Sequence, residues 1–67
     1  MKHPINNFEF EIYVEQLGNG FIGCYTCPCG YNHCSTHEES KEMAIITAKG
    51  QAFTHYQTKH NKDYKNT

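Results

Sequence analysis

Residues 24–34 read CYTCPCGYNHC, and they contain all four cysteines of the 67-residue chain. Pro28 and Gly30 are typical of a tight turn, so this segment predicts a β-hairpin that carries cysteines on and beside its turn. His55 and His60 follow towards the end of the chain. Thiolate and imidazole are the usual ligands of tetrahedral zinc. The sequence therefore predicts a metal site formed by both histidines and two of the cysteines.

Several cysteine pairs fit that prediction. Cys24 and Cys27 have the commonest spacing, with two residues between them. Cys29 is followed by a glycine, which metal-binding turns favour, so Cys24 with Cys29 and Cys27 with Cys29 stay open. Cys34 would lie opposite Cys24 in a hairpin centred on Cys29, and Cys27 with Cys34 is a further pair. Cys27 belongs to most of these pairs and ranks first, ahead of Cys24 and Cys29 together and then Cys34.

The histidines set a geometric condition. His55 and His60 are five residues apart, which separates them by about 140° on an ideal helix. Both reach one ion only if the last helical turn tightens or unwinds. His55 shares the helix face predicted to be buried, so it is the firmer ligand. His33 and His37 are expected to be surface or capping residues, because a structural zinc site usually takes four ligands.

The length of the chain makes an added source of stability necessary. A domain of this size has little margin from its hydrophobic core, and it usually adds a metal, disulfides or a partner subunit. The segment MKHPINNFEFEIYV at residues 1–14 lacks the apolar core and cleavage site of a signal peptide. We therefore expect an intracellular protein, cytoplasmic or with the nucleoid or nucleus, whose thiols are free or bind metal rather than form disulfides.

The pattern before the cysteines predicts strands. Apolar and mostly acidic residues alternate over 8–15, which indicates a strand with one buried face. A turn at 17–20 should lead to a second strand over 21–26, and residues 31–35 can return as a third. The expected fold class is α+β, with an antiparallel hairpin or three-stranded meander packed on one C-terminal helix. We expect a single domain over 1–67, with 1–7 and 62–67 frayed.

The pattern after the cysteines predicts the helix. The segment from Thr36 to Glu39 fits a capping box and predicts that the helix begins there. One helical stripe comprises Ala44, Ile45, Ala48, Ala52 and His55. Its small alanines would let the helix lie close to a sheet. Asn61 can end the helix in a left-handed conformation.

From about Ile22 to His60 the chain resembles the Cys2His2, or ββα, zinc fingers. The resemblance is carried by the Cys24-x2-Cys27 region and by His55-x4-His60. It implies one structural zinc ion held between a hairpin and a helix. More residues separate Cys27 from His55 than the roughly dozen usual in a finger, so the helix must be longer or begin earlier. An N-terminal strand is a second departure from the minimal finger.

A closed site points to binding rather than catalysis. Four protein ligands leave zinc no open coordination position, so we expect no enzyme activity. We expect a small regulatory factor that binds a protein. Ile46 and Phe53 widen the apolar arc of the helix beyond what a hairpin covers, and we expect the N-terminal strand to cover them. Any part left exposed would suit docking or dimerisation.

Nucleic acid is the alternative partner. Two lysines accompany six glutamates in residues 1–48, whereas four lysines accompany Asp63 alone in residues 49–67. Lysines for phosphates and tyrosines for base stacking form a workable surface at the C-terminal end. The residues concerned are Lys49, Lys59, Lys62, Lys65, Tyr56 and Tyr64. The glutamates near the helix start and the absence of arginine disfavour major-groove reading. No apolar run has transmembrane length, so no membrane partner is expected.

Overall fold

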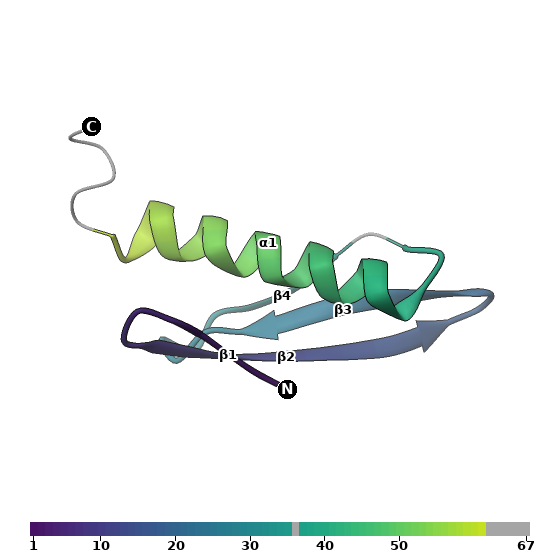
Figure 1. Cartoon of the computed structure of the whole chain (residues 1–67), viewed down its shortest axis with the longest axis horizontal. Coiled ribbons are helices and arrows are strands. Elements are labelled where there is room, and N and C mark those ends of the chain that lie inside the picture. The colour runs from purple at the N-terminus through teal and green to yellow at the C-terminus, as the bar shows by residue number, and fades with distance from the viewer. Residues whose placement is uncertain (36, 62–67) are drawn as a thin grey trace.

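The computed structural model describes residues 1–35 and 37–61. A four-stranded antiparallel sheet has the strand order β1-β2-β3-β4, and one helix lies along one face of it (Figure 1). The elements are β1 (Lys2–Ile5), β2 (Phe8–Leu17), β3 (Gly20–Thr26), β4 (Asn32–Cys34) and α1 (Lys41–Lys59). This is the expected α+β fold, and it has one more strand than the expected meander.

The additional strand is β1, in a segment that the sequence analysis expected to fray. Lys2–Ile5 pairs with the start of β2 across a turn in which Asn6 has a φ of 54°. Asparagine adopts this left-handed conformation more readily than most residues. Ile5 is buried in the core, which ties the N-terminal segment to the sheet. Residues 62–67 lie outside the described part of the chain.

The predicted alternation in β2 is confirmed. Phe10 and Ile12 are fully buried on the face towards α1, and Phe8 packs against the same core. Glu9 and Glu11 point to the opposite face and are exposed. Leu17 pairs with Gly20 across the next hairpin, where Gly18 has a φ of 61°.

The helix lies close to β3 because the facing residues are small. Ala44, Ala48 and Ala52 are fully buried against the sheet, as the alanine stripe predicts. Gly23 is the point of nearest approach, since a Cβ atom there would overlap the backbone carbonyl of Ala44. Tyr56 completes the buried face one turn further on, and its hydroxyl accepts a hydrogen bond from Asn6 Nδ2 at 2.7 Å.

Both predicted helix ends need correction. The N-cap is Ser40, whose hydroxyl accepts from the Met43 N–H at 3.1 Å, and Thr36 lies outside the described residues. Glu38 does not begin the helix, because its backbone exchanges hydrogen bonds of 2.7 and 2.8 Å with Phe21 of β3. The C-cap is His60 with a φ of −123°, and Asn61 does not adopt the expected left-handed conformation.

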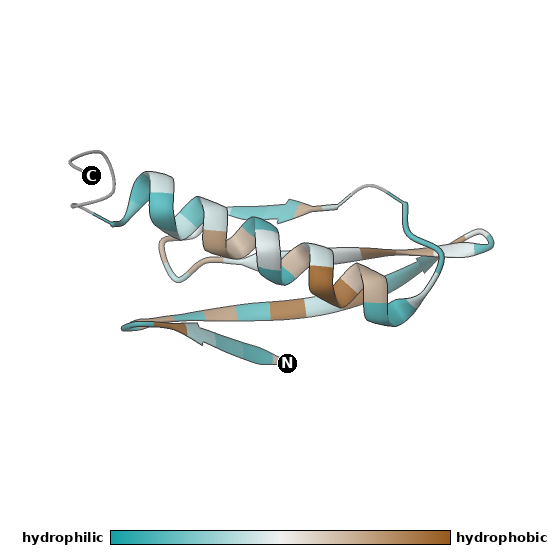
Figure 2. Ribbon diagram, turned by 45° about the horizontal axis from the view of Figure 1, so that its top comes forward, coloured by the Kyte–Doolittle hydropathy of each residue, from teal (hydrophilic) through white to brown (hydrophobic). Residues whose placement is uncertain are grey.

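Hydropathy varies along α1. Figure 2 shows the most hydrophobic helix residues in its N-terminal half and hydrophilic residues in its last turns. Among the described residues, no helix combines the length and apolar character needed to cross a bilayer.

Candidate metal centre

The turn after β3 presents two cysteines to the end of the helix. The Cys27 N–H donates to the Tyr31 carbonyl at 2.7 Å, and the Gly30 N–H donates to the Cys27 carbonyl at 2.9 Å. Gly30 has a φ of 101°, a conformation that side-chain-bearing residues rarely adopt. Cys27 continues the helix-facing side of β3 and is buried, whereas Cys29 lies at the exposed tip of the turn.

The end of α1 brings the two histidines together. His55 lies within the helix, and His60 follows its last residue with a backbone conformation that is no longer helical. This departure rotates His60 towards His55, and their Nε2 atoms are 3.3 Å apart. An ideal helix would keep them about 140° apart, so the unwinding that the spacing required is present.

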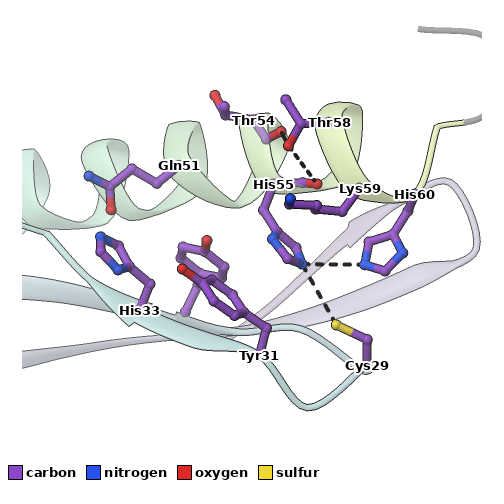
Figure 3. Close-up of a pocket in the computed structure, with 10 residues that line it drawn as sticks. Cys29, Tyr31, His33, Gln51, Thr54, His55, Thr58, Lys59 and His60 are labelled. Carbon is purple, nitrogen blue, oxygen red and sulfur yellow. Dashed lines mark hydrogen bonds between the residues drawn. The ribbon is translucent and has the colours of Figure 1, made fainter. Parts of the chain in front are cut away.

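The four side chains converge on one point. Sγ of Cys27 lies 3.4 Å from Nε2 of His60, and Sγ of Cys29 lies 3.7 Å from Nε2 of His55 (Figure 3 draws the latter). One ligand atom from each residue lies within 4.8 Å of all the others. Zinc bonds of about 2.3 Å to sulfur and 2.0–2.1 Å to nitrogen imply tetrahedral S–N edges of about 3.5 Å and N–N edges of about 3.3 Å. The two S–N separations and the N–N separation are therefore close to those around a single tetrahedral zinc ion, and the four residues could hold one.

Aromatic rings support both imidazoles. Tyr31 stacks on His55 with ring centroids 4.6 Å apart and planes 5° apart. Phe8 packs on His60 at 4.4 Å. Such neighbours limit ring rotation and so orient the nitrogen donors. This role of Tyr31 and Phe8 was not predicted from the sequence. The available signal was the position of Tyr31, an aromatic residue directly after the turn glycine Gly30.

Burial changes the protonation of two of the donors. Desolvation lowers the pKa of His55, and the nearby His60 and Lys59 lower it further. His55 is therefore neutral at pH 7, which is the form that binds metal. Desolvation is also the main reason that the pKa of the Cys27 thiol is raised, with Cys29 close by. A bound cation would reverse that effect, because it stabilises the thiolate.

Cys24, a candidate ligand from the sequence, lies elsewhere. It forms a disulfide with Cys34, and their Cα atoms are 4.0 Å apart. The two residues are directly opposed on β3 and β4, as a hairpin centred near Cys29 predicts. Because side chains alternate along a strand, the side chain of Cys24 points away from the face on which Tyr25 and Cys27 meet the helix. The expectation that the thiols stay free or bind metal is thus wrong for this pair. A disulfide and a group of four metal donors coexist.

His33 and His37, expected to be surface or capping residues, do not join the donor group. His37 Nε2 lies 3.2 Å from the Leu17 carbonyl, beside the β2–β3 turn. His33 is exposed on β4, and its ring lies parallel to Tyr31.

The hairpin, the C-terminal helix and the Cys2His2 donor group agree with the resemblance to ββα zinc fingers in layout. Beyond this, no family model matches the chain, and neither a curated protein nor a solved structure matches it.

Proposed function

We propose that this chain is a zinc-stabilised, non-catalytic binding module that docks on a protein partner as a small regulatory factor. The spacing of the donor atoms of Cys27, Cys29, His55 and His60 carries the proposal, because it matches a tetrahedral ion. Four protein ligands would saturate zinc and leave no position for substrate. Structural zinc contributes roughly 10–16 kcal/mol on binding, which in a domain this small becomes folding free energy.

The exposed side of α1 supports a protein partner. Met43, Ile46 and Phe53 are 49%, 61% and 48% exposed, respectively. The prediction that the N-terminal strand covers Ile46 and Phe53 is wrong. The alanine face packs on the sheet, and Ile46 and Phe53 lie about 140–160° around the helix from Ala48, on the side away from the sheet. A second copy of the chain is one partner that this face would suit.

The opposite side of the molecule has a different chemical character. Glu9, Glu11 and Glu15 are exposed on the sheet face away from α1. Two of these carboxylates form ion pairs, Glu9 with Lys2 at 3.2 Å and Glu11 with the N-terminal amino group at 3.1 Å. A face without excess positive charge offers little attraction to the phosphates of a nucleic acid and suits a protein partner better. The alternative nucleic-acid surface depends on Lys62, Tyr64 and Lys65, which lie outside the described residues. Tyr56, which that alternative also uses, is buried and cannot stack on a base.

The first test concerns the metal. Native mass spectrometry should find one zinc ion per chain, and circular dichroism should show loss of helix when a strong chelator removes it. A chain without metal, whose spectrum is unchanged by the chelator, would refute the proposal.

The second test concerns the exposed helix face. Sedimentation velocity on the zinc-loaded protein should detect self-association, and Phe53→Ser should abolish it. Leu17→Ser is the matched control, because Leu17 is 55% exposed at the far hairpin. A monomer at all concentrations would exclude the second copy and leave only a different protein as the partner.

Binding to generic single-stranded DNA that weakens steeply with salt would favour the nucleic-acid alternative.

A further inference from the structure

A groove of about 730 Å³ runs beside the metal centre, between α1 and β4 (Figure 3). Tyr31 and His33 line it from the sheet side, and Gln51 and Thr54 line it from the helix. These four side chains are not among the metal donors. The groove adjoins the metal centre and shares Cys29, His55 and His60 with it, but these four side chains give it a part of its own.

Two parallel rings form a slot in this groove. The rings of Tyr31 and His33 are 9° from parallel, with centroids 6.4 Å apart. The other face of Tyr31 is covered by His55, so the face towards His33 is the one left to stack on a ligand. The buried ring of Tyr25 lies beside both rings, with centroids 6.2 Å from Tyr31 and 6.1 Å from His33. A flat ring between two others needs planes about 7 Å apart, because carbon atoms touch at about 3.5 Å. His33 is exposed, so its ring can turn away from Tyr31 to admit one.

A polar group beside the slot lacks a partner. Oε1 of Gln51 is buried and accepts no hydrogen bond from the described residues. Figure 3 shows the amide end of Gln51 extending over the ring of His33. A buried acceptor without a donor is unfavourable, so an N–H group from a ligand in the slot would be bound there. A glutamine amide offers an acceptor beside a donor, which matches the amino group and adjacent ring nitrogen of adenine.

A cation lies further along the same groove. Lys59 lines it and forms no ion pair with a carboxylate of residues 1–35 or 37–61. Gln51 and Lys59 are eight residues apart on α1, about 12 Å along the axis. Figure 3 shows the Lys59 side chain running back along the helix above His55. A phosphate joined to the base by a ribose would lie between the slot and this ammonium.

We infer that the groove binds an adenine nucleotide. The base stacks between Tyr31 and His33, its amino group donates to Oε1 of Gln51, and its phosphate faces Lys59. A free nucleotide and an unpaired adenosine in a single strand offer the same chemistry. The inference goes beyond the proposed function, because it uses the groove rather than the exposed side of α1.

Titration of the zinc-loaded full chain with AMP tests the inference. Tyr25 and Tyr31 line the groove, so NMR shifts of their ring protons report on it. AMP should bind saturably, and IMP, which lacks the amino group, should bind at least fivefold more weakly. Binding of both AMP and single-stranded oligo(dA) would identify the nucleotide unit as the ligand, and binding of oligo(dA) alone would identify the single strand as its source. No saturable change with either up to about 10 mM would overturn the inference.

Three variants separate the parts of the site. Tyr31→Ala should weaken AMP binding roughly ten- to a hundredfold, as expected for a lost stacking contact. Gln51→Leu should remove the difference between AMP and IMP. Tyr13→Ala is the control, because Tyr13 is exposed on the opposite face of the sheet and its loss should change nothing. Zinc content measured on each variant separates loss of metal from loss of ligand. Equal binding of AMP, IMP and phenylalaninamide by the wild type would overturn the inference in favour of a generic aromatic slot.

Discussion

The two ends of α1 are joined to the sheet by different chemistry. Towards its N-terminal end, the helix contacts β3 through Gly23 and Ala44, a close apolar fit that needs no added group. At its C-terminal end, two sulfur and two nitrogen donors crowd together at separations within 4.8 Å. The first end is joined by packing, whereas the second has a cluster of lone pairs that a cation would satisfy. The two ends should therefore respond to different substitutions.

Removal of a donor should have the largest effect. Cys27→Ser replaces the buried thiolate donor, and we expect loss of zinc and of most helical signal, because structural zinc contributes roughly 10–16 kcal/mol. Native mass spectrometry and circular dichroism measure the two losses. His33→Gln is the control, since His33 is outside the donor group, and it should retain one zinc ion. Retention of zinc by Cys27→Ser would contradict the assignment of this donor.

Removal of the disulfide should have a smaller effect that leaves the metal in place. Replacing Cys24 and Cys34 by alanine opens a bridge with a sequence separation of 10, which should cost about 2–3 kcal/mol. Zinc stoichiometry should stay at one per chain, because neither residue belongs to the donor group. Chemical denaturation of the zinc-loaded protein measures the change. Loss of zinc from this double variant would show that the bridge is needed to position Cys27 and Cys29.

Two glycines test the apolar end. Gly23→Ala should destabilise the protein by about 1–3 kcal/mol, because the new methyl group would meet the Ala44 carbonyl. Gly50→Ala is the matched change, since a Cβ atom there meets open space on the helix. It should stabilise the protein by up to about 1 kcal/mol. Thermal unfolding of both variants in the presence of zinc measures the contrast, and equal effects would show that the helix does not lie close to β3.

The pH dependence of metal affinity sharpens the comparison at the metal end. Burial raises the pKa of Cys27 above its ordinary 9.0, so the metal-free thiol keeps its proton at pH 7 and metal must displace it. Burial lowers the pKa of His55, so this residue releases fewer protons at neutral pH than an ordinary histidine would. Because zinc must displace the Cys27 proton, this residue alone should make zinc binding about tenfold tighter for each unit of rising pH across the neutral range. Competition titrations with a chromophoric chelator measure this slope, and a flat profile would contradict it.

In the metal-free protein, His55 and Cys27 change the pH dependence of folding stability in opposite directions, because burial lowers the pKa of His55 and raises that of Cys27. A lowered pKa in the folded state means that the unfolded chain binds the proton more readily. Stability contributed by neutral His55 should therefore be present above the ordinary histidine pKa of about 6.5 and be lost as the pH falls below it.

Local patterns in the sequence account for much of this fold. The alternation around Phe10 and Ile12 defines the buried face of β2, and the alanine spacing from Ala44 to Ala52 defines the buried face of α1. Both patterns work because side-chain direction follows directly from strand and helix period. The donor types and the two histidines, His55 and His60, were also predicted, because thiols and imidazoles at such spacings have few other reasons to cluster. Which two cysteines join them was left open.

Contacts between distant segments account for the rest. Spacing left several cysteine pairs open as ligands. The pairing of β3 with β4 places Cys24 against Cys34 in a disulfide and leaves Cys27 and Cys29 beside the histidines. The helix begins at Lys41 rather than at the capping-box pattern, because the backbone of Glu38 pairs with Phe21. Ile46 stays exposed because the close fit at Gly23 orients the helix on its alanines. Local sequence sets which way each side chain points along its own element, but register and helix rotation come from packing between elements, and no short pattern encodes that packing.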